Sequence, residues 1–291
     1  MKETNEISAL LHLIDDPDTE VYTSVRNKLL SFGKEVIPNL EYLWETTDNP
    51  FIQERVEMLI HSVQFEDVKS KLSDWMQQKE PDLITGAFIV NSYHFPELSY
   101  TDLSQQIEKI RRNIWLELNP YLTSLEQINI LTGILFQYYS FKKNPIDYSR
   151  PADFLLSYLL ETKKGNALGL AVLQLILAQL SDIPLQLLQI PGQLVLGYCK
   201  PQENEKESGE FHHISFFVDG GSGQIFSRKE IELYLKREGM EWSDEYFKPM
   251  SPKKIIAQLI DEYASCFQSD DLLYKFRELK ILAETIRGNS Q

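Results

Sequence analysis

The sequence has 291 residues, of which 43% are hydrophobic, so it is long enough for one large domain or two smaller ones. Its 43 acidic residues outnumber the 29 basic ones and give a net charge of −14, which argues against nucleic acids and anionic membrane surfaces as partners, because both bind basic proteins. Two cysteines, and an N-terminus without the basic start and apolar run of a signal peptide, predict a cytoplasmic protein with free thiols.

The first 80 residues are predicted to form paired helices, because apolar residues recur there at helical spacing. Two apolar stripes lie 31 positions apart in the sequence: Val21, Val25, Leu29 and Phe32, then Ile52, Val56, Ile60 and Val63. A helix pair repeated at this spacing resembles a HEAT-like repeat, and an ordinary irregular helical bundle is the alternative. We therefore predict a helical, HEAT-like domain over residues 1–80.

The chain from residue 81 to about residue 160 is also expected to be mostly helical. Helices are predicted at Leu83 to Tyr93, along the apolar stripe of 103–118 and at Leu125 to Phe141. Ser124 and Gln127 have the spacing of a capping box for the third of these helices. All three precede the stretch around which the rest of the chain is organised.

That central stretch begins with an almost entirely apolar helix from Ala167 to Leu180, in which only Gln174 and Gln179 are polar. Fourteen residues are too few to span a bilayer, which needs roughly 20. A helix that is apolar on nearly every face must therefore be buried inside the protein. Asn166, directly before it, is suited to cap the free N–H groups of its first turn.

Antiparallel strands are predicted after this helix, at Pro184 to Ile190, Leu194 to Cys199 and Phe211 to Asp219. Pro191-Gly192 marks a turn between the first two strands, and the charged residues 201–210 form an exposed hairpin loop. A short helix near Leu235 and a final helix pair after Pro249 complete the sequence. The fold class predicted from these elements is α+β.

Four blocks of this sequence, in their order, resemble the bacterial transglutaminase-like proteins of the SirB type. They are PDLITGAFIVNSYHFPEL, FQYYSFKKNPIDY, LLETKKGNALGLAVLQLILAQLSDIPLQLLQIPGQLVLGY and FFVDGGSG, within about residues 82–235. The resemblance implies a papain/transglutaminase-like core, in which a buried helix packs on an antiparallel sheet, over residues 81–248. It also implies that residues 249–291, the final helix pair, are the remnant of a tetratricopeptide-like tail.

In active members of the wider superfamily a cysteine opens the central helix, a histidine follows on a strand and an aspartate on the next. The helix dipole stabilises the thiolate, while the histidine acts as base and acid and the carboxylate orients it. Carried over by position, the resemblance places this triad at Ala167, Gln193 and Asp219. Alanine has no nucleophile, and glutamine cannot exchange a proton near neutral pH.

We therefore expect a pseudoenzyme that binds a protein or peptide partner in an inherited cleft, with Asn166, Gln193 and Asp219 as candidate contacts. Asp219 lies in a glycine-rich turn, where a purely structural role, accepting hydrogen bonds from nearby backbone, is the alternative. No cofactor is expected.

A second hypothesis is a hydrolase or acyltransferase with an atypical residue set. If the 201–210 loop closes symmetrically, Cys199 stands opposite His212, and the two residues form a Cys–His pair across a hairpin. The alternative is a buried structural cysteine beside an ordinary strand histidine. No metal site is expected at His212-His213, because neighbours on a strand point to opposite faces.

Overall fold

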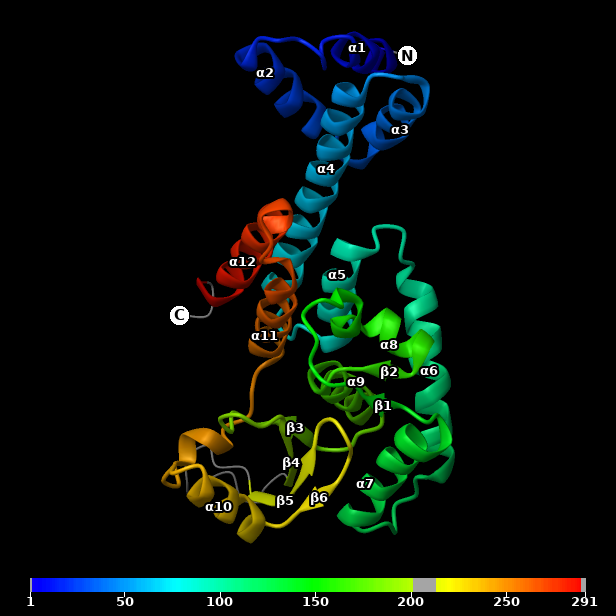
Figure 1. Cartoon of the computed structure of the whole chain (residues 1–291). Coiled ribbons are helices and arrows are strands. Elements are labelled where there is room, and N and C mark those ends of the chain that lie inside the picture. The colour runs from blue at the N-terminus through cyan, green and yellow to red at the C-terminus, as the bar shows by residue number, and fades with distance from the viewer. Residues whose placement is uncertain (1, 201–212, 289–291) are drawn as a thin grey trace. The chain divides into compact units, whose positions relative to one another are not determined.

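The computed structural model describes residues 2–200 and 213–288, which form a helix-rich α+β protein (Figure 1). The chain divides into two compact units, Met1–Asp74 and Trp75–Gln291. The predicted fold class is confirmed at this level. The division into three parts at residues 80 and 248 stays a prediction.

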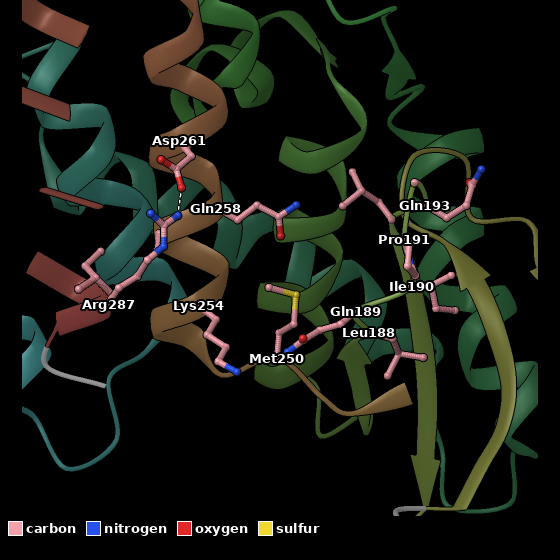
Figure 2. A pocket seen from close by; sticks show the side chains of 14 residues that line it. Leu188, Gln189, Ile190, Pro191, Gln193, Met250, Lys254, Gln258, Asp261 and Arg287 are labelled. Atoms are coloured by element: carbon pink, nitrogen blue, oxygen red, sulfur yellow. Dashed lines mark ion pairs between the residues drawn. The ribbon is translucent and has the colours of Figure 1, made fainter. Parts of the chain in front are cut away.

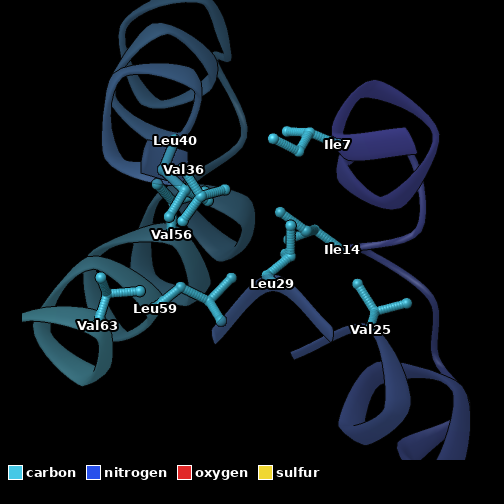
Figure 3. Packing of buried hydrophobic residues seen from close by; sticks show 9 residues of the cluster. All are labelled: Ile7, Ile14, Val25, Leu29, Val36, Leu40, Val56, Leu59 and Val63. Carbon is cyan, nitrogen blue, oxygen red and sulfur yellow. The ribbon is translucent and has the colours of Figure 1, made fainter. Parts of the chain in front are cut away.

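The first unit is helical, and its elements are α1 (Lys2–Leu11), α2 (Thr19–Leu30), the 3-10 turn η1 (Gly33–Val36), α3 (Ile37–Thr46) and most of α4 (Pro50–Gln77). Both apolar stripes predicted from the sequence contribute to its core, Val25 and Leu29 from α2 and Val56 and Val63 from α4 (Figure 3). The helices form here because each buries such a stripe, which removes apolar area from water.

The second unit holds the remaining helices and all strands among the described residues. Its α-helices are α5 (Leu83–His94), α6 (Tyr100–Glu117), α7 (Ser124–Thr132), α8 (Leu156–Thr162), α9 (Ala167–Leu180), α10 (Arg228–Arg237), α11 (Pro252–Ala264) and α12 (Leu273–Gly288). Shorter turns connect them: the π-helix η2 (Gly133–Tyr138) and the 3-10 turns η3 (Pro151–Phe154), η4 (Asp244–Phe247), η5 (Ser265–Phe267) and η6 (Asp270–Leu272).

The capping box of α7 lies one residue earlier than predicted. Thr123 is the N-cap, and its hydroxyl oxygen accepts from the backbone N–H of Glu126, whose carboxylate accepts from the backbone N–H of Thr123. The frames Ser124–Gln127 and Thr123–Glu126 overlap in the sequence. The charged carboxylate of Glu126 accepts a stronger hydrogen bond than the amide of Gln127, so the earlier frame is used.

The strands form a four-stranded antiparallel sheet in the order β3 (Leu185–Leu187), β4 (Val195–Lys200), β5 (His213–Asp219) and β6 (Ile225–Phe226). A separate two-stranded parallel ribbon joins β1 (Lys142–Lys143) to β2 (Lys164–Gly165). The three predicted strands are present, although the first is shorter than expected, and Phe211 and His212 lie outside the described residues. The start of β4, directly after the β3–β4 turn, lies beside the end of β5, because Val195 pairs with Asp219.

Helix α9 is the interior helix that the sequence predicts. It contacts β3 and the helices α5, α6, α7, α8 and α11, and Figure 1 shows it between the sheet and the upper helices of this unit. The Nε2 atom of its buried Gln174 donates a 2.6 Å hydrogen bond to the carbonyl oxygen of Gly220, just after β5. A Cβ on Gly220 would lie 2.7 Å from the Cβ of Ala171, so only glycine lets this turn approach the helix so closely.

Replacing Gly220 with alanine is expected to lower the free energy of unfolding by about 1–3 kcal/mol, because the new methyl group overpacks against Ala171 and the Leu194 carbonyl oxygen. Urea denaturation measures the change. Gly133→Ala is the matched control, because Gly133 has helical φ and ψ angles and open space where the Cβ would lie. Equal stability of the two variants would contradict the close approach of the turn to α9.

Candidate functional site

The residues at the three predicted triad positions line one cavity of about 400 Å³ in the second unit. Ala167 is the first residue of α9, Gln193 lies in the turn between β3 and β4, and Asp219 ends β5. Asn166 lines the same cavity. The structure thus brings together all four residues that the sequence analysis proposed for the cleft.

The start of α9 is held in place by Asn166, which is buried. Its side-chain oxygen accepts a 2.8 Å hydrogen bond from the backbone N–H of Gly169, and its own N–H donates to the carbonyl oxygen of Asp153. Ala167 is therefore fixed at a helix N-terminus, where the dipole would stabilise an anion. Its side chain is only a methyl group and offers no nucleophile there.

Asp219 organises the glycine-rich turn that follows β5. Its Oδ1 atom accepts three hydrogen bonds, from the backbone N–H of Gly221 at 3.0 Å and from the N–H and hydroxyl of Ser222 at 2.7 Å each. This is the arrangement by which an aspartate stabilises a turn without any catalytic partner. The turn packs on the helix start, because a Cβ on Gly221 would lie 3.2 Å from the Cβ of Ala167.

Gln193 occupies the exposed turn that forms the opposite wall of the cavity. Its backbone N–H donates to the carbonyl oxygen of Ile190 at 3.3 Å, and the turn passes through Gly192, whose φ of 72° suits glycine. The Tyr234 hydroxyl donates to the Pro191 carbonyl oxygen at 3.1 Å and so anchors the turn to α10. The amide of Gln193 can donate and accept hydrogen bonds but cannot transfer a proton.

Three polar residues of the cavity were missed by the sequence analysis: Lys143, Gln258 and Glu262. Lys143 pairs with Gly165 in the β1–β2 ribbon, which brings it beside the start of α9. Gln258 and Glu262 are four residues apart on α11, so they share one helix face. The i, i+4 spacing was visible in the sequence, but nothing in it indicated that this face meets the central helix.

Cys199 lies away from this cavity, in the middle of the sheet. It pairs with Ile214 instead of His212, because Lys200 pairs with His213 and the strands are therefore offset from the register of a symmetric 201–210 loop. The expectation that Cys199 stands opposite His212 is therefore wrong. His212 itself lies outside the described residues. Burial raises the pKa of the Cys199 thiol to about 11, which disfavours the nucleophilic thiolate.

Within residues 2–200 and 213–288, no group of three or more His, Cys, Asp or Glu side chains is arranged to hold a metal ion. No helix there has both the length and the apolar character needed to cross a bilayer.

Comparisons with known proteins support one family. The model described as "Transglutaminase-like superfamily" matches residues 101–261. A UPF0162 protein of Pseudomonas aeruginosa is 24% identical over 196 residues, which cover 66% of this chain and 67% of that protein. The F-box only protein 21 of Mus musculus is 18% identical over 247 residues, covering 76% of this chain but 38% of that protein. No solved structure matches the sequence significantly.

Asp219→Ala is expected to lower the free energy of unfolding by about 1–3 kcal/mol, because three donors of the turn lose their acceptor. Asp219→Asn retains an oxygen at the same place and should keep most of that stability. Thermal or urea unfolding of both variants measures the difference. A loss for Asp219→Asn as large as that for Asp219→Ala would contradict the turn-forming role.

The two native thiols are expected to react slowly with iodoacetamide. Burial raises the pKa of Cys266 to about 12, with a further contribution from the negative charges of Asp147, Glu262 and Asp153, and that of Cys199 is about 11. At pH 8 both thiols stay protonated in the folded protein, so alkylation should be at least ~100-fold slower than in the urea-unfolded protein. Mass spectrometry of quenched samples measures both rates, and equal rates would contradict the burial of these thiols.

Proposed function

Since the chain belongs to the transglutaminase-like superfamily, we propose that it is a non-catalytic member that binds an extended segment of a protein partner in its cleft. The main support is the residue at the start of α9. Ala167 stands at the helix N-terminus, in the same cavity as Gln193 and Asp219, and has no atom that can attack a carbonyl carbon. The scaffold is kept while two of the three reactive side chains are replaced by inert ones.

The chemistry of the cavity wall favours a peptide over a small ion as occupant. Gln193, Gln258 and Asn166 carry amide groups, and an amide supplies both a donor and an acceptor, as a peptide bond requires. Ile146, Phe154 and Ile190 supply the apolar part of the same wall. A pocket that combines apolar surface with polar groups that fix the orientation of a ligand is typical of a specific binding site.

The alternative of an enzyme with an atypical residue set has less support. It depends on Cys199, whose thiol is buried in the sheet with its pKa raised to about 11. A thiol held protonated in this way is a poor nucleophile at physiological pH. We therefore retain the binding function as the better proposal.

Several finer assignments belong to the same proposal. We place the protein in the SirB type of the family, in the cytoplasm of a bacterium, and with the three-part organisation of residues 1–80, 81–248 and 249–291. The HEAT-like character of the first part is supported by the two stripes at 31-residue spacing, whose members on α2 and α4 share one apolar core. The last part, with α11 and α12, is proposed as the tetratricopeptide-like remnant.

Binding can be tested by selecting random displayed heptapeptides on the immobilised full-length protein. The selected peptides, labelled with fluorescein, should bind Gln193→Ala about fivefold more weakly, which is the effect of one lost hydrogen bond. Gln179→Ala, at the exposed far end of α9, is the matched control and should bind as the unaltered protein does. A selection that yields no binders would contradict the proposal, as would peptides that bind Gln193→Ala and the unaltered protein equally well.

Restoring the missing side chains tests the carried-over positions. In Ala167→Cys with Gln193→His, the helix dipole and an imidazolium should lower the pKa of the new thiol, so that iodoacetamide alkylates it at pH 6. We expect a rate at least ~tenfold above that of a simple thiol, whereas Ala167→Cys alone should react more slowly than the double variant. Residue 167 and Cys199 lie on one tryptic peptide, because no Lys or Arg separates them, so fragmentation of that peptide in the mass spectrometer assigns the alkylated thiol. A thiol pKa that stays at about 8.5 in the double variant would contradict these positions.

A further inference from the structure

A second cavity, of about 630 Å³, adjoins the candidate site within the same unit. It lies between the segment from Leu188 to Leu194 and the helices α11 and α12 (Figure 2). Of the three positions carried over from the family triad, Gln193 lines both cavities, whereas Ala167 and Asp219 line the first cavity alone. It is therefore an additional feature of the molecule that the proposed function does not yet explain.

The polar wall of this cavity is one face of α11. Lys254, Gln258 and Asp261 follow at positions i, i+4 and i+7, so their side chains lie along the same side of the helix. The opposite side is fixed in the core by Ile256 and Leu259 among others, which are almost fully buried. In Figure 2, Lys254 and Gln258 project from α11 on the side of the 188–193 segment, and Arg287 reaches Asp261.

The charges on this wall do not cancel. The carboxylate of Asp261 pairs with two cations, the Nζ atom of Lys280 at 2.6 Å and the guanidinium of Arg287. Lys280 does not line the cavity, so the lining carries two cations, Arg287 and Lys254, against the one carboxylate of Asp261. Within residues 2–200 and 213–288, Lys254 makes no ion pair. A local positive excess in a protein of net charge −14 attracts an anionic group.

The first cavity has the opposite balance. Its lining carries the carboxylates of Asp219 and Glu262 against the single cation of Lys143. The difference means that an acidic group is favoured in the second cavity and disfavoured in the first. The two cavities therefore distinguish the ends of a ligand that occupies both.

The two cavities share a wall, because Ile190, Gly192, Gln193, Leu194 and Gln258 line both of them. An extended polypeptide advances about 3.3 Å per residue, so a few residues suffice to pass from one cavity to the next. The amides of Gln193 and Gln258 lie at the crossing, where they can accept from and donate to the peptide backbone.

We propose that the second cavity is a subsite for a carboxylate of the bound peptide, and that Lys254 is the residue that contacts it. The proposal rests on the peptide-binding function proposed above and adds the chemical class of the segment: an extended peptide with a carboxylate a few residues from the part that fills the first cavity. Lys254 supplies the charge directly, while Arg287 is already paired with Asp261. The carboxylate belongs either to an acidic residue within the peptide or to the peptide's own C-terminus.

The test uses arrays of N-acetylated heptapeptides with randomised positions, probed with the full-length protein. In each set one position is fixed as Glu, Gln or Lys, and every set is made with a C-terminal amide and with a free C-terminal carboxylate. We expect Glu to be retained about tenfold over Gln at one position of the amide sets, or the free-acid sets to be retained over the amide sets by a similar factor. The first result identifies an acidic residue and the second a C-terminus.

Charge reversal then assigns the subsite to its residue. Lys254→Glu should change the preference from Glu to Lys, or abolish the preference for the free acid, with no change in thermal unfolding, because Lys254 is exposed. Lys253→Glu, the neighbouring lysine outside the cavity lining, is the control of equal charge and should retain the original preference.

The outcomes separate this proposal from the one on which it rests. Peptides that bind without any preference for a carboxylate, or whose preference survives Lys254→Glu, would overturn the subsite and leave the peptide-binding function in place. An array on which no peptide binds would overturn both. Loss of the preference in Lys253→Glu to the same extent as in Lys254→Glu would also overturn the assignment to Lys254, because it would reflect overall charge alone.

Discussion

The contact between the turn after β5 and the central helix is the constraint on which the second unit depends. Gln174 is one of the two polar side chains of α9 that the sequence shows, and its amide holds the carbonyl of Gly220 inside the core. Because Gly220 has no side chain, its backbone packs against Ala171. This contact fixes Asp219 beside the first turn of α9 and so determines the shape of the cleft.

The cleft is built from three separate segments of the second unit. The start of α9, the β3–β4 turn and the end of β5 meet around one cavity, and each has its own hydrogen bonds: the Asn166 cap, the Tyr234 anchor and the Asp219 turn. None of these bonds uses the side chain of Ala167. Fold and chemistry are therefore separable here, and function has to be argued from the side chains that face the cavity.

The sequence predicted the elements well where burial determines them. Helix α9 was evident because fourteen residues with two polar side chains can only be interior. Details that depend on local competition or on pairing between strands were less accessible. The N-cap of α7 had two overlapping frames, and a symmetric loop count could not give the register in which Lys200 pairs with His213. Lys143 lies in the parallel β1–β2 ribbon and Glu262 lies on α11, far along the chain from α9. No local sequence pattern shows that either residue lines the cavity.

The backbone of Gly220 has a second partner, since its N–H donates to the carbonyl oxygen of Leu194 at 2.8 Å. Gly220, directly after β5, is thus hydrogen-bonded both to the central helix α9 and to the loop that lines the two cavities. The loop and the turn that carries Asp219 are therefore held by the same residue. Neither segment can move away from the central helix without breaking a hydrogen bond of Gly220.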